Sequence, residues 1–270
     1  MSFVGFCKRN LALSQLAIIT QTEYRVNFIV DALAQPVLMA FVEIILWHAI
    51  FRGSGMSQIA GFGLGSYISY VIWAGFFSRI SANWMYEFRM IEEVNLGRIN
   101  SVLLRPISFY EYYLSQFLGY KAVIVAVSLV IPISVVSVMG YPFFIERLPM
   151  VIFMLLAYLV FTYTMSFVVV CSAFFFNRVQ SLTVTKNMTL WILGGELFPL
   201  DLVPQPYQQY LLNLPFSSGV FVPVGYLTGR LQMSDMIHGF MTIFIGIFVC
   251  GLISVILWRK AIQEYSGTGA

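Results

Sequence analysis

The chain has 270 residues, of which 59% are hydrophobic and only 10% are charged, and its formal net charge is +3. A soluble domain would carry about 25% charged residues, so this composition excludes a soluble protein and predicts an integral membrane protein in contact with the lipid bilayer. The small net charge gives no reason to expect a nucleic-acid partner. Cys7, Cys171 and Cys250 lie far apart without CxxC spacing, which indicates neither a disulfide framework nor a metal site.

The first 25 residues combine cationic and apolar positions. Lys8 and Arg9 precede an apolar run that is short, is interrupted by Ser14 and Gln15, and lacks a small-residue cleavage site, which argues against a signal peptide. An amphipathic helix at the membrane interface fits better, because apolar side chains can enter the lipid while Lys8 and Arg9 meet the headgroups. We therefore expect an interfacial helix within residues 1–25.

Six later stretches are candidates for transmembrane helices, which need about 20 mostly apolar residues to cross the hydrocarbon core. They cover residues 26–51, 64–83, 118–139, 149–176, 179–198 and 236–258. The fifth is the weakest because polar residues load its beginning, so we expect it inside a helix bundle rather than against lipid. These polar residues are Ser181, Thr183, Thr185, Lys186 and Asn187. The expected fold is an all-α integral membrane protein with six transmembrane helices and a single domain over residues 1–270.

Lys and Arg residues are distributed unevenly between the two expected sides of the membrane. If the N-terminus is cytoplasmic, that side holds twelve of the 15 and the other side holds three, and cytoplasmic loops normally carry the excess. We therefore expect a multi-pass protein of the cell (plasma or inner) membrane, with both termini and residues 84–117 in the cytoplasm. The twelve are Lys8, Arg9, Arg25, Arg79, Arg89, Arg98, Arg105, Lys121, Arg178, Lys186, Arg259 and Lys260, and the three are Arg52, Arg147 and Arg230.

The connection at residues 84–117 is much longer than two neighbouring spans require, and it gathers several charged residues. Apolar residues from Trp84 to Val94 recur at helical spacing, which predicts a helix lying along the inner membrane face. Gly97 can end this helix, and Pro106 suits the first turn of a following one. The stretch between them is expected to project into the cytoplasm.

Residues 199–235 form a connection that is too long and too aromatic for a simple turn. Prolines divide it into short apolar pieces, and residues 207–214 and 216–227 could each form a short helix. Neither piece can cross a membrane, so we expect a re-entrant hairpin or a pair of helices at the outer leaflet. Such a hairpin could close the outer mouth of a pathway, and its candidate gate residues are Pro199, Pro215, Phe216 and Pro223.

Four polar residues lie within or beside the expected spans. Asp31, Gln35 and Glu43 fall on loosely one face of the first span, and Glu196 lies at the outer end of the fifth. An acidic side chain at the bilayer centre costs about 2.5 to 3.5 kcal/mol on insertion scales, so such residues usually face a protein interior or a water-filled path. We interpret the four as candidate substrate-pathway residues. Asp31 could instead pair with Arg25, and Glu196 could be a hydrated interfacial acid.

Enzyme signatures are missing from the sequence. It contains no HExxH, GxSxG or GxxxxGK[ST] motif and no His/Cys cluster with ligand spacing. We therefore expect no catalytic residue, no metal site and no cofactor in this chain.

Four stretches in a particular order resemble the membrane subunits of type-2 ATP-binding-cassette (ABC) exporters. They are GRINSVLLRPIS at residues 97–108, GGELFPL at 194–200, LPF at 214–216 and VPVGYLTG at 222–229. Each motif is weak alone, but their order and spacing, together with the expected spans, extend the likeness over nearly the whole chain.

The resemblance implies that residues 92–104 act as a coupling helix, which sits in a groove on a separate ATPase subunit. The residues expected at this contact are Glu92, Glu93, Arg98, Ile99, Val102 and Leu103. It also implies a second permease subunit, identical or paralogous, that faces this one across the substrate path. ATP and magnesium would bind to the partner ATPase, which is consistent with the missing phosphate loop here. No family pattern accounts for Asp31 or Glu43.

The leading hypothesis is therefore an export permease driven by a partner ATPase. The alternative is an autonomous secondary transporter or channel that uses Asp31, Glu43 and Glu196 as ion or proton relays, although no internal repeat is visible. An intramembrane enzyme acting on lipid would need a nucleophile and a base, and the sequence offers no convincing pair.

Overall fold

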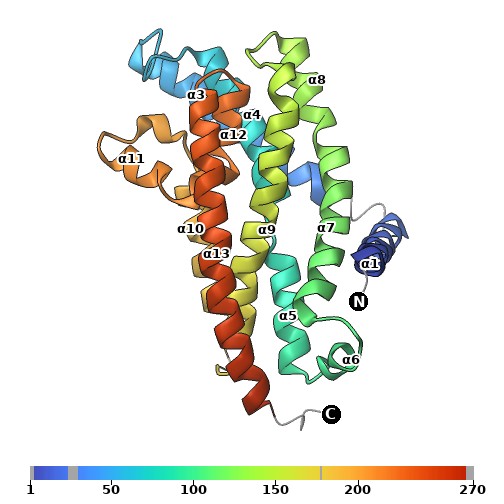
Figure 1. Cartoon of the computed structure of the whole chain (residues 1–270). Coiled ribbons are helices and arrows are strands. Elements are labelled where there is room, and N and C mark those ends of the chain that lie inside the picture. The colour runs from blue at the N-terminus through green and yellow to red at the C-terminus, as the bar shows by residue number, and fades with distance from the viewer. Residues whose placement is uncertain (1–2, 24–29, 177, 266–270) are drawn as a thin grey trace.

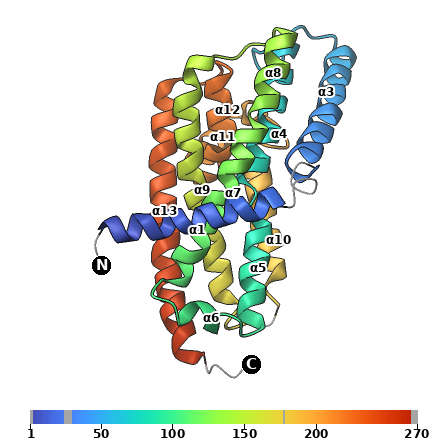
Figure 2. The same ribbon diagram turned by 90° about the vertical axis from the view of Figure 1, so that its right-hand side faces the viewer.

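The computed structural model describes residues 3–23, 30–176 and 178–265, and within these ranges the chain is helical, with no β-strand beyond an isolated bridge. Long helices run side by side in a bundle, and one helix lies across them (Figures 1 and 2). In chain order, the elements are α1 (Phe3–Glu23), η1 (Val30–Ala34), α3 (Gln35–Ser54), α4 (Leu64–Ser81), α5 (Trp84–Asn95), α6 (Asn100–Leu103), α7 (Phe109–Ser128), α8 (Val130–Met139), η2 (Ile145–Arg147), α9 (Leu148–Ser172), α10 (Gln180–Leu193), η3 (Leu200–Leu202), α11 (Tyr207–Leu212), η4 (Pro215–Gly219), α12 (Phe221–Leu227) and α13 (Met233–Glu264). The expected all-α architecture is confirmed.

The bundle has two distinct ends. One end, called here the α6 end, carries α6 and the last turns of α13, whereas the opposite α12 end carries α8 and α12 (Figure 1). The short helices expected within residues 199–235 are present as α11 and as η4 followed by α12. The segment expected to couple to an ATPase and the segment expected to close the outer mouth therefore lie toward opposite ends of the molecule.

Four described segments are long and apolar enough to cross a membrane. They are Pro36–Ser54, Phe109–Met139, Ile145–Ser172 and Met233–Glu264, and they fall at the first, third, fourth and sixth predicted spans. The helices at the second and fifth positions, α4 and α10, do not reach that standard. Of the 18 residues of α4, 12 are buried inside the protein, so this helix can carry polar groups that lipid would not tolerate. Helix α10 has 14 residues and is about 21 Å long, short of the roughly 30 Å of a hydrocarbon core.

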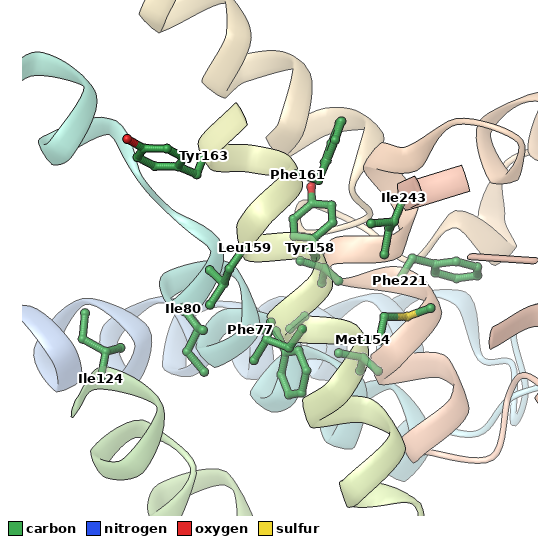
Figure 3. Packing of buried hydrophobic residues seen from close by; sticks show 14 of the residues in the cluster. Phe77, Ile80, Ile124, Met154, Tyr158, Leu159, Phe161, Tyr163, Phe221 and Ile243 are labelled. Carbon is green, nitrogen blue, oxygen red and sulfur yellow. The ribbon is translucent and has the colours of Figure 1, made fainter. Parts of the chain in front are cut away.

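The core of the bundle forms around α4 and α9, and Figure 3 shows part of it. Its labelled members are Phe77 and Ile80 of α4, Ile124 of α7, Met154, Tyr158, Leu159, Phe161 and Tyr163 of α9, Phe221 of α12 and Ile243 of α13. Lipid is as apolar as these side chains, so close packing and interhelical hydrogen bonds hold membrane helices together. Such bonds fix α4, because Tyr70 donates to the carbonyl of Gly195 at 2.6 Å and Ser69 donates to that of Pro142 at 2.8 Å.

Helix α1 crosses the bundle and docks on α7 (Figure 2). Arg9 forms an ion pair with Glu111 of α7 and donates to the carbonyl of Pro106 at 2.7 Å. Ser14 donates to the carbonyl of Ser115 at 2.7 Å. The expected helix is confirmed, but Arg9 is bound by protein instead of facing outward to headgroups. The other side of α1 remains exposed and apolar, through Leu11, Leu16 and Ile19.

Helix α5 differs from its predicted position. It continues in the direction of α4 beyond a break at Ala82 and Asn83, and it packs against α9 and α10 within the bundle (Figures 1 and 2). A helix lying along the membrane face was therefore the wrong expectation. The amphipathic pattern was real, but its buried side meets other helices and not lipid. This side consists of Tyr86, Glu87, Met90, Ile91 and Val94.

Candidate functional site

A cavity of about 370 Å³ lies between α3, α4, α5, α9 and α10. Small-molecule pockets are usually about 300 to 1,000 Å³, so the volume suffices for a small organic ligand. Its wall includes the carboxylates of Glu43 and Glu196 and the aromatic rings of Trp84, Tyr158 and Trp191. We refer to it as the α3/α10 cavity.

Two of the predicted pathway residues meet at this cavity, although 152 positions separate them in the chain. Glu43 comes from α3, and Glu196 follows the end of α10. Both acids line the cavity, together with Ser78 of α4 and Trp191 of α10. The sequence therefore identified two acids that share one internal surface.

The other two pathway candidates are Asp31 and Gln35, whose side chains lie outside the described residues. Their backbones belong to η1 and to the first position of α3. Because η1 is a π-helix, the helical register shifts between Asp31 and Glu43, so these two residues do not follow the regular α-helical spacing assumed from the sequence. A pathway role for Asp31 and Gln35 stays a prediction.

Two hydroxyl groups on the cavity wall have no hydrogen-bond partner among the described residues. They belong to Thr183 of α10, which is only 1% exposed, and to Ser81 at the end of α4. A buried polar group normally has a partner, because leaving it unpaired costs free energy. In the sequence, Thr183 stands out as one of the polar residues at the beginning of the fifth span. Nothing in the sequence distinguishes Ser78, Ser81 and Arg79 from other polar residues as members of a site.

The break between α4 and α5, beside the cavity, is held by two buried lysines. Lys186 of α10 forms an ion pair with Glu87, and its ammonium group also donates to Asn83 Oδ1 at 3.1 Å and Ser166 Oγ at 2.6 Å. Lys121 of α7 donates to the carbonyl of Ala82, at the end of α4. The sequence interpretation counted both lysines among the cytoplasmic charges. They lie inside the bundle instead, because backbone carbonyls and a carboxylate satisfy them there.

At the α6 end, the charged residues expected to contact an ATPase bind one another. Arg98 lies 2.9 Å from a carboxylate oxygen of Glu92 and 3.7 Å from one of Glu93. The side chains of Arg98 and Glu92 are 53% and 61% exposed, whereas that of Glu93 is 17% exposed. This group therefore presents a locally paired, solvent-accessible surface.

The expected apolar contact residues divide into two groups. Leu103 is exposed, but Ile99 and Val102 are 0% and 3% exposed and belong to the core of the chain itself. The expectation that Ile99 and Val102 contact a partner was therefore wrong, because in this tight α6 turn they face inward and anchor it. The neighbouring residues Leu96 and Leu104 are 51% and 89% exposed and were missed.

At the α12 end, the four candidate gate residues lie in well-packed structure. Pro199 is buried just before η3, Pro215 and Phe216 begin η4, and Pro223 is buried within α12. Helix α12 packs against α4, α9 and α13, so it enters the bundle as a short internal helix. Their role as a gate stays a prediction.

A single arginine, Arg230, holds several segments of this end together. Arg230 forms an ion pair with Asp201 at 2.5 Å. Its guanidinium also lies over the rings of Phe62, Tyr67 and Tyr70, at 4.3, 4.4 and 5.1 Å from their centroids. A guanidinium held by aromatic faces and a carboxylate joins the segment after α12 to α4.

Comparison with known proteins identifies the family. Residues 37–269 match the family described as ABC-2 family transporter protein, which covers most of the chain. No curated protein sequence matches it. Across the residues that the structure describes, no group of three His, Cys, Asp or Glu side chains could hold a metal ion. With its bundle of apolar helices, the chain therefore belongs to the ABC-2 transporter family as a multi-pass membrane permease component of an ABC transporter.

Proposed function

We propose that this chain is an export permease, which forms a substrate pathway with a second permease subunit and is driven by separate ATP-binding-cassette ATPase subunits. The observation that carries the proposal is the surface at the α6 end. Leu103 and Leu104 are exposed there beside the paired Arg98 and Glu92, while Ile99 and Val102 anchor the same turn in the core. A small, rigid, partly apolar projection is suited to docking in a groove.

In the proposed topology, the six spans are α3, α4, α7 with α8, α9, α10 and α13, and α5 continues from α4 on the cytoplasmic side. The α6 end and both termini are cytoplasmic, α1 lies at the inner interface, and α11 and α12 are on the outer side of the cell membrane. Removing the internal Arg79, Lys121 and Lys186 from the twelve still leaves nine Lys and Arg residues on the proposed cytoplasmic side, against three on the other side. ATP and magnesium bind to the partner ATPase.

The exposed side of α3 supports a second permease subunit. Only 11% of the span Pro36–Ser54 is buried within the chain, and Leu38, Phe41 and Val42 are among its exposed side chains. This helix also borders the α3/α10 cavity through Glu43. A second subunit on this side would complete a pathway that includes the cavity, and the packed segment from Pro199 to Pro223 would close it at the outer end.

Leu104→Asp tests the ATPase contact. It places a charge at a residue that is 89% exposed, so we expect normal membrane insertion and stability. If Leu104 is central to the contact, association with the ATPase subunit should fall roughly 30-fold or more, as for an interface residue worth about 2 kcal/mol. The measurements are copurification of an ATP-binding-cassette subunit and ATP hydrolysis by the reconstituted complex.

Met56→Asp is the matched control, because Met56 is an apolar residue of similar kind, 60% exposed, in the loop after α3 at the other end of the bundle. It should leave ATPase association unchanged. The charge reversal Glu92→Lys with Glu93→Lys provides an independent test of the same surface. Wild-type association and hydrolysis in both the Leu104 and the double-Lys variants would refute the coupling role.

The second candidate function is an autonomous secondary transporter or channel. The meeting of Glu43 and Glu196 at one cavity is the observation that favours it. Liposomes that contain only this chain would then move substrate under an ion gradient, without any ATPase. An export permease should show no such transport until the ATPase and ATP are supplied.

A further inference from the structure

The wall of the α3/α10 cavity carries more acidic side chains than basic ones. Glu43 and Glu196 contribute two carboxyl groups, and Arg79 contributes one guanidinium. Both acids line the same cavity, so a positive charge bound there would be attracted by each carboxylate. An anion would instead meet two like charges. The balance of the wall therefore favours a cation.

The hydroxyl groups of the wall supply further polar contacts. The oxygens of Thr183 and Ser81 lack a partner within the described part of the chain, and Thr183 is 1% exposed. A buried hydroxyl that faces a cavity of this size can bind a water molecule or a polar group of a ligand. This unsatisfied capacity is independent of the acidic pair and also points to an occupant.

The rest of the wall is suited to a large apolar body. Trp84 and Phe88 of α5, Tyr158 of α9 and Trp191 of α10 contribute aromatic rings to it. Aromatic faces attract organic cations and pack against flat apolar groups. A bare inorganic cation would leave these surfaces unused, because it prefers a shell of oxygen ligands.

We propose that the α3/α10 cavity binds hydrophobic organic cations, with the positive charge beside Glu43 and Glu196 and the apolar body against the aromatic residues. This inference rests on the proposed function and assigns a substrate class to it. The cargo of this permease is then a small cation with an aromatic or otherwise bulky apolar body.

Two probes of the same shape and opposite charge test the inference. Tetraphenylphosphonium is a hydrophobic cation, and tetraphenylborate is its anionic counterpart. The full-length chain in neutral detergent micelles should bind the cation at least roughly tenfold more tightly than the anion, because two carboxyl groups face one guanidinium. Equilibrium dialysis with protein-free micelles as the blank measures both affinities and removes partition into detergent.

Neutral variants then locate the site. Glu43→Gln with Glu196→Gln should weaken binding of the cation roughly 10- to 100-fold and narrow the difference between the two probes. Glu146→Gln is the matched control, because Glu146 is an exposed acid in η2, away from the cavity. Glu196→Asp keeps the charge and should retain most of the binding. Gel filtration and thermal melting establish that each variant is folded.

Several results would overturn the inference. One is equal affinity of the protein for the two probes, and another is absence of cation binding. The third is an equal loss of cation affinity in the Glu146→Gln control and in the double Gln variant, when both variants are folded. These assays use the chain alone, so they do not depend on an ATPase. If the wild-type chain does not associate with an ATPase subunit, the proposed export function is refuted, and cation binding can still be measured. If the chain couples to an ATPase but does not bind the cation, the substrate class alone is refuted.

Discussion

Helix α5 contributes a glutamate to each of two ion-pair clusters, one buried inside the bundle and one exposed at the surface. Glu87 pairs with Lys186, and these side chains are 0% and 3% exposed. Glu92, five residues later, pairs with Arg98, and these are 61% and 53% exposed. The first pair joins α5 to α10 across 99 residues of sequence, and the second remains within the α6 end.

The comparison shows that burial, and not the kind of charge, decides what each cluster contributes. An exposed pair adds about 0 to 1 kcal/mol to stability, because water and salt screen it. Removing one partner of a buried pair leaves an uncompensated charge and typically costs about 3 to 5 kcal/mol. The buried cluster should therefore determine whether the chain folds, and the exposed cluster should determine what the folded chain binds.

Glu87→Leu, in the buried cluster, should cause the largest loss of stability. Among the described residues, it leaves the buried Lys186 ammonium with Asn83 and Ser166 as its remaining polar partners, so we expect the free energy of unfolding to fall by about 3 to 5 kcal/mol. Titration with sodium dodecyl sulfate in mixed micelles measures that free energy.

The double variant Glu87→Leu with Lys186→Met is its control. It removes both charges, so its stability should recover to near that of the wild type or above it. A double variant as unstable as the single one would contradict this account and would show that the ion pair itself, and not the unpaired charge, determines stability.

Ser166→Ala should have the next largest effect. Lys186 donates to Ser166 Oγ at 2.6 Å inside the bundle, and a hydrogen bond to a charged group contributes about 1.5 to 3 kcal/mol. The same titration should show a loss in that range. Ser134→Ala is the comparison, since the Ser134 hydroxyl is exposed and donates to the carbonyl of Val130 in its own helix. A similar loss of stability in both variants would mean that burial is not the cause.

Arg98→Ala should have the smallest effect on stability, about 1 kcal/mol or less, because its ion pairs with Glu92 and Glu93 are at the surface. Its association with the ATPase should nevertheless weaken, and more so at low salt concentration, where surface charges are screened least. Binding titrations at two salt concentrations measure this. A large loss of stability would remove the distinction between the two clusters.

Much of the fold was predictable from local sequence. The apolar stretches located four membrane spans, and the prolines of residues 199–235 marked short helices that the structure contains. The helical spacing around residues 84–94 predicted α5 but not its surroundings. Spacing shows that a helix has an apolar side, and it does not show whether lipid or protein covers that side.

The site was predictable in part for the same reason. Acids such as Glu43 and Glu196 stand out because they are costly in lipid, but nothing local in the sequence shows that they share a cavity. Ile99 and Val102 were assigned to a partner because they are apolar, and only the tertiary structure shows that they face the core. Lys186 was read as a cytoplasmic charge because its partner, Glu87, lies on another helix.

The position of Lys186 also has a consequence for how the chain enters the membrane during synthesis. Helix α10 has only 14 residues, and a lysine near the middle of a membrane helix costs about 2.5 to 3.5 kcal/mol on insertion scales, so this segment is a poor substrate for insertion alone. Its polar partners on α5 and α9 precede it in the chain and are already available when it is made. We therefore expect α10 to enter by associating with helices that have been inserted before it, so that integration of this segment depends on residues synthesised earlier.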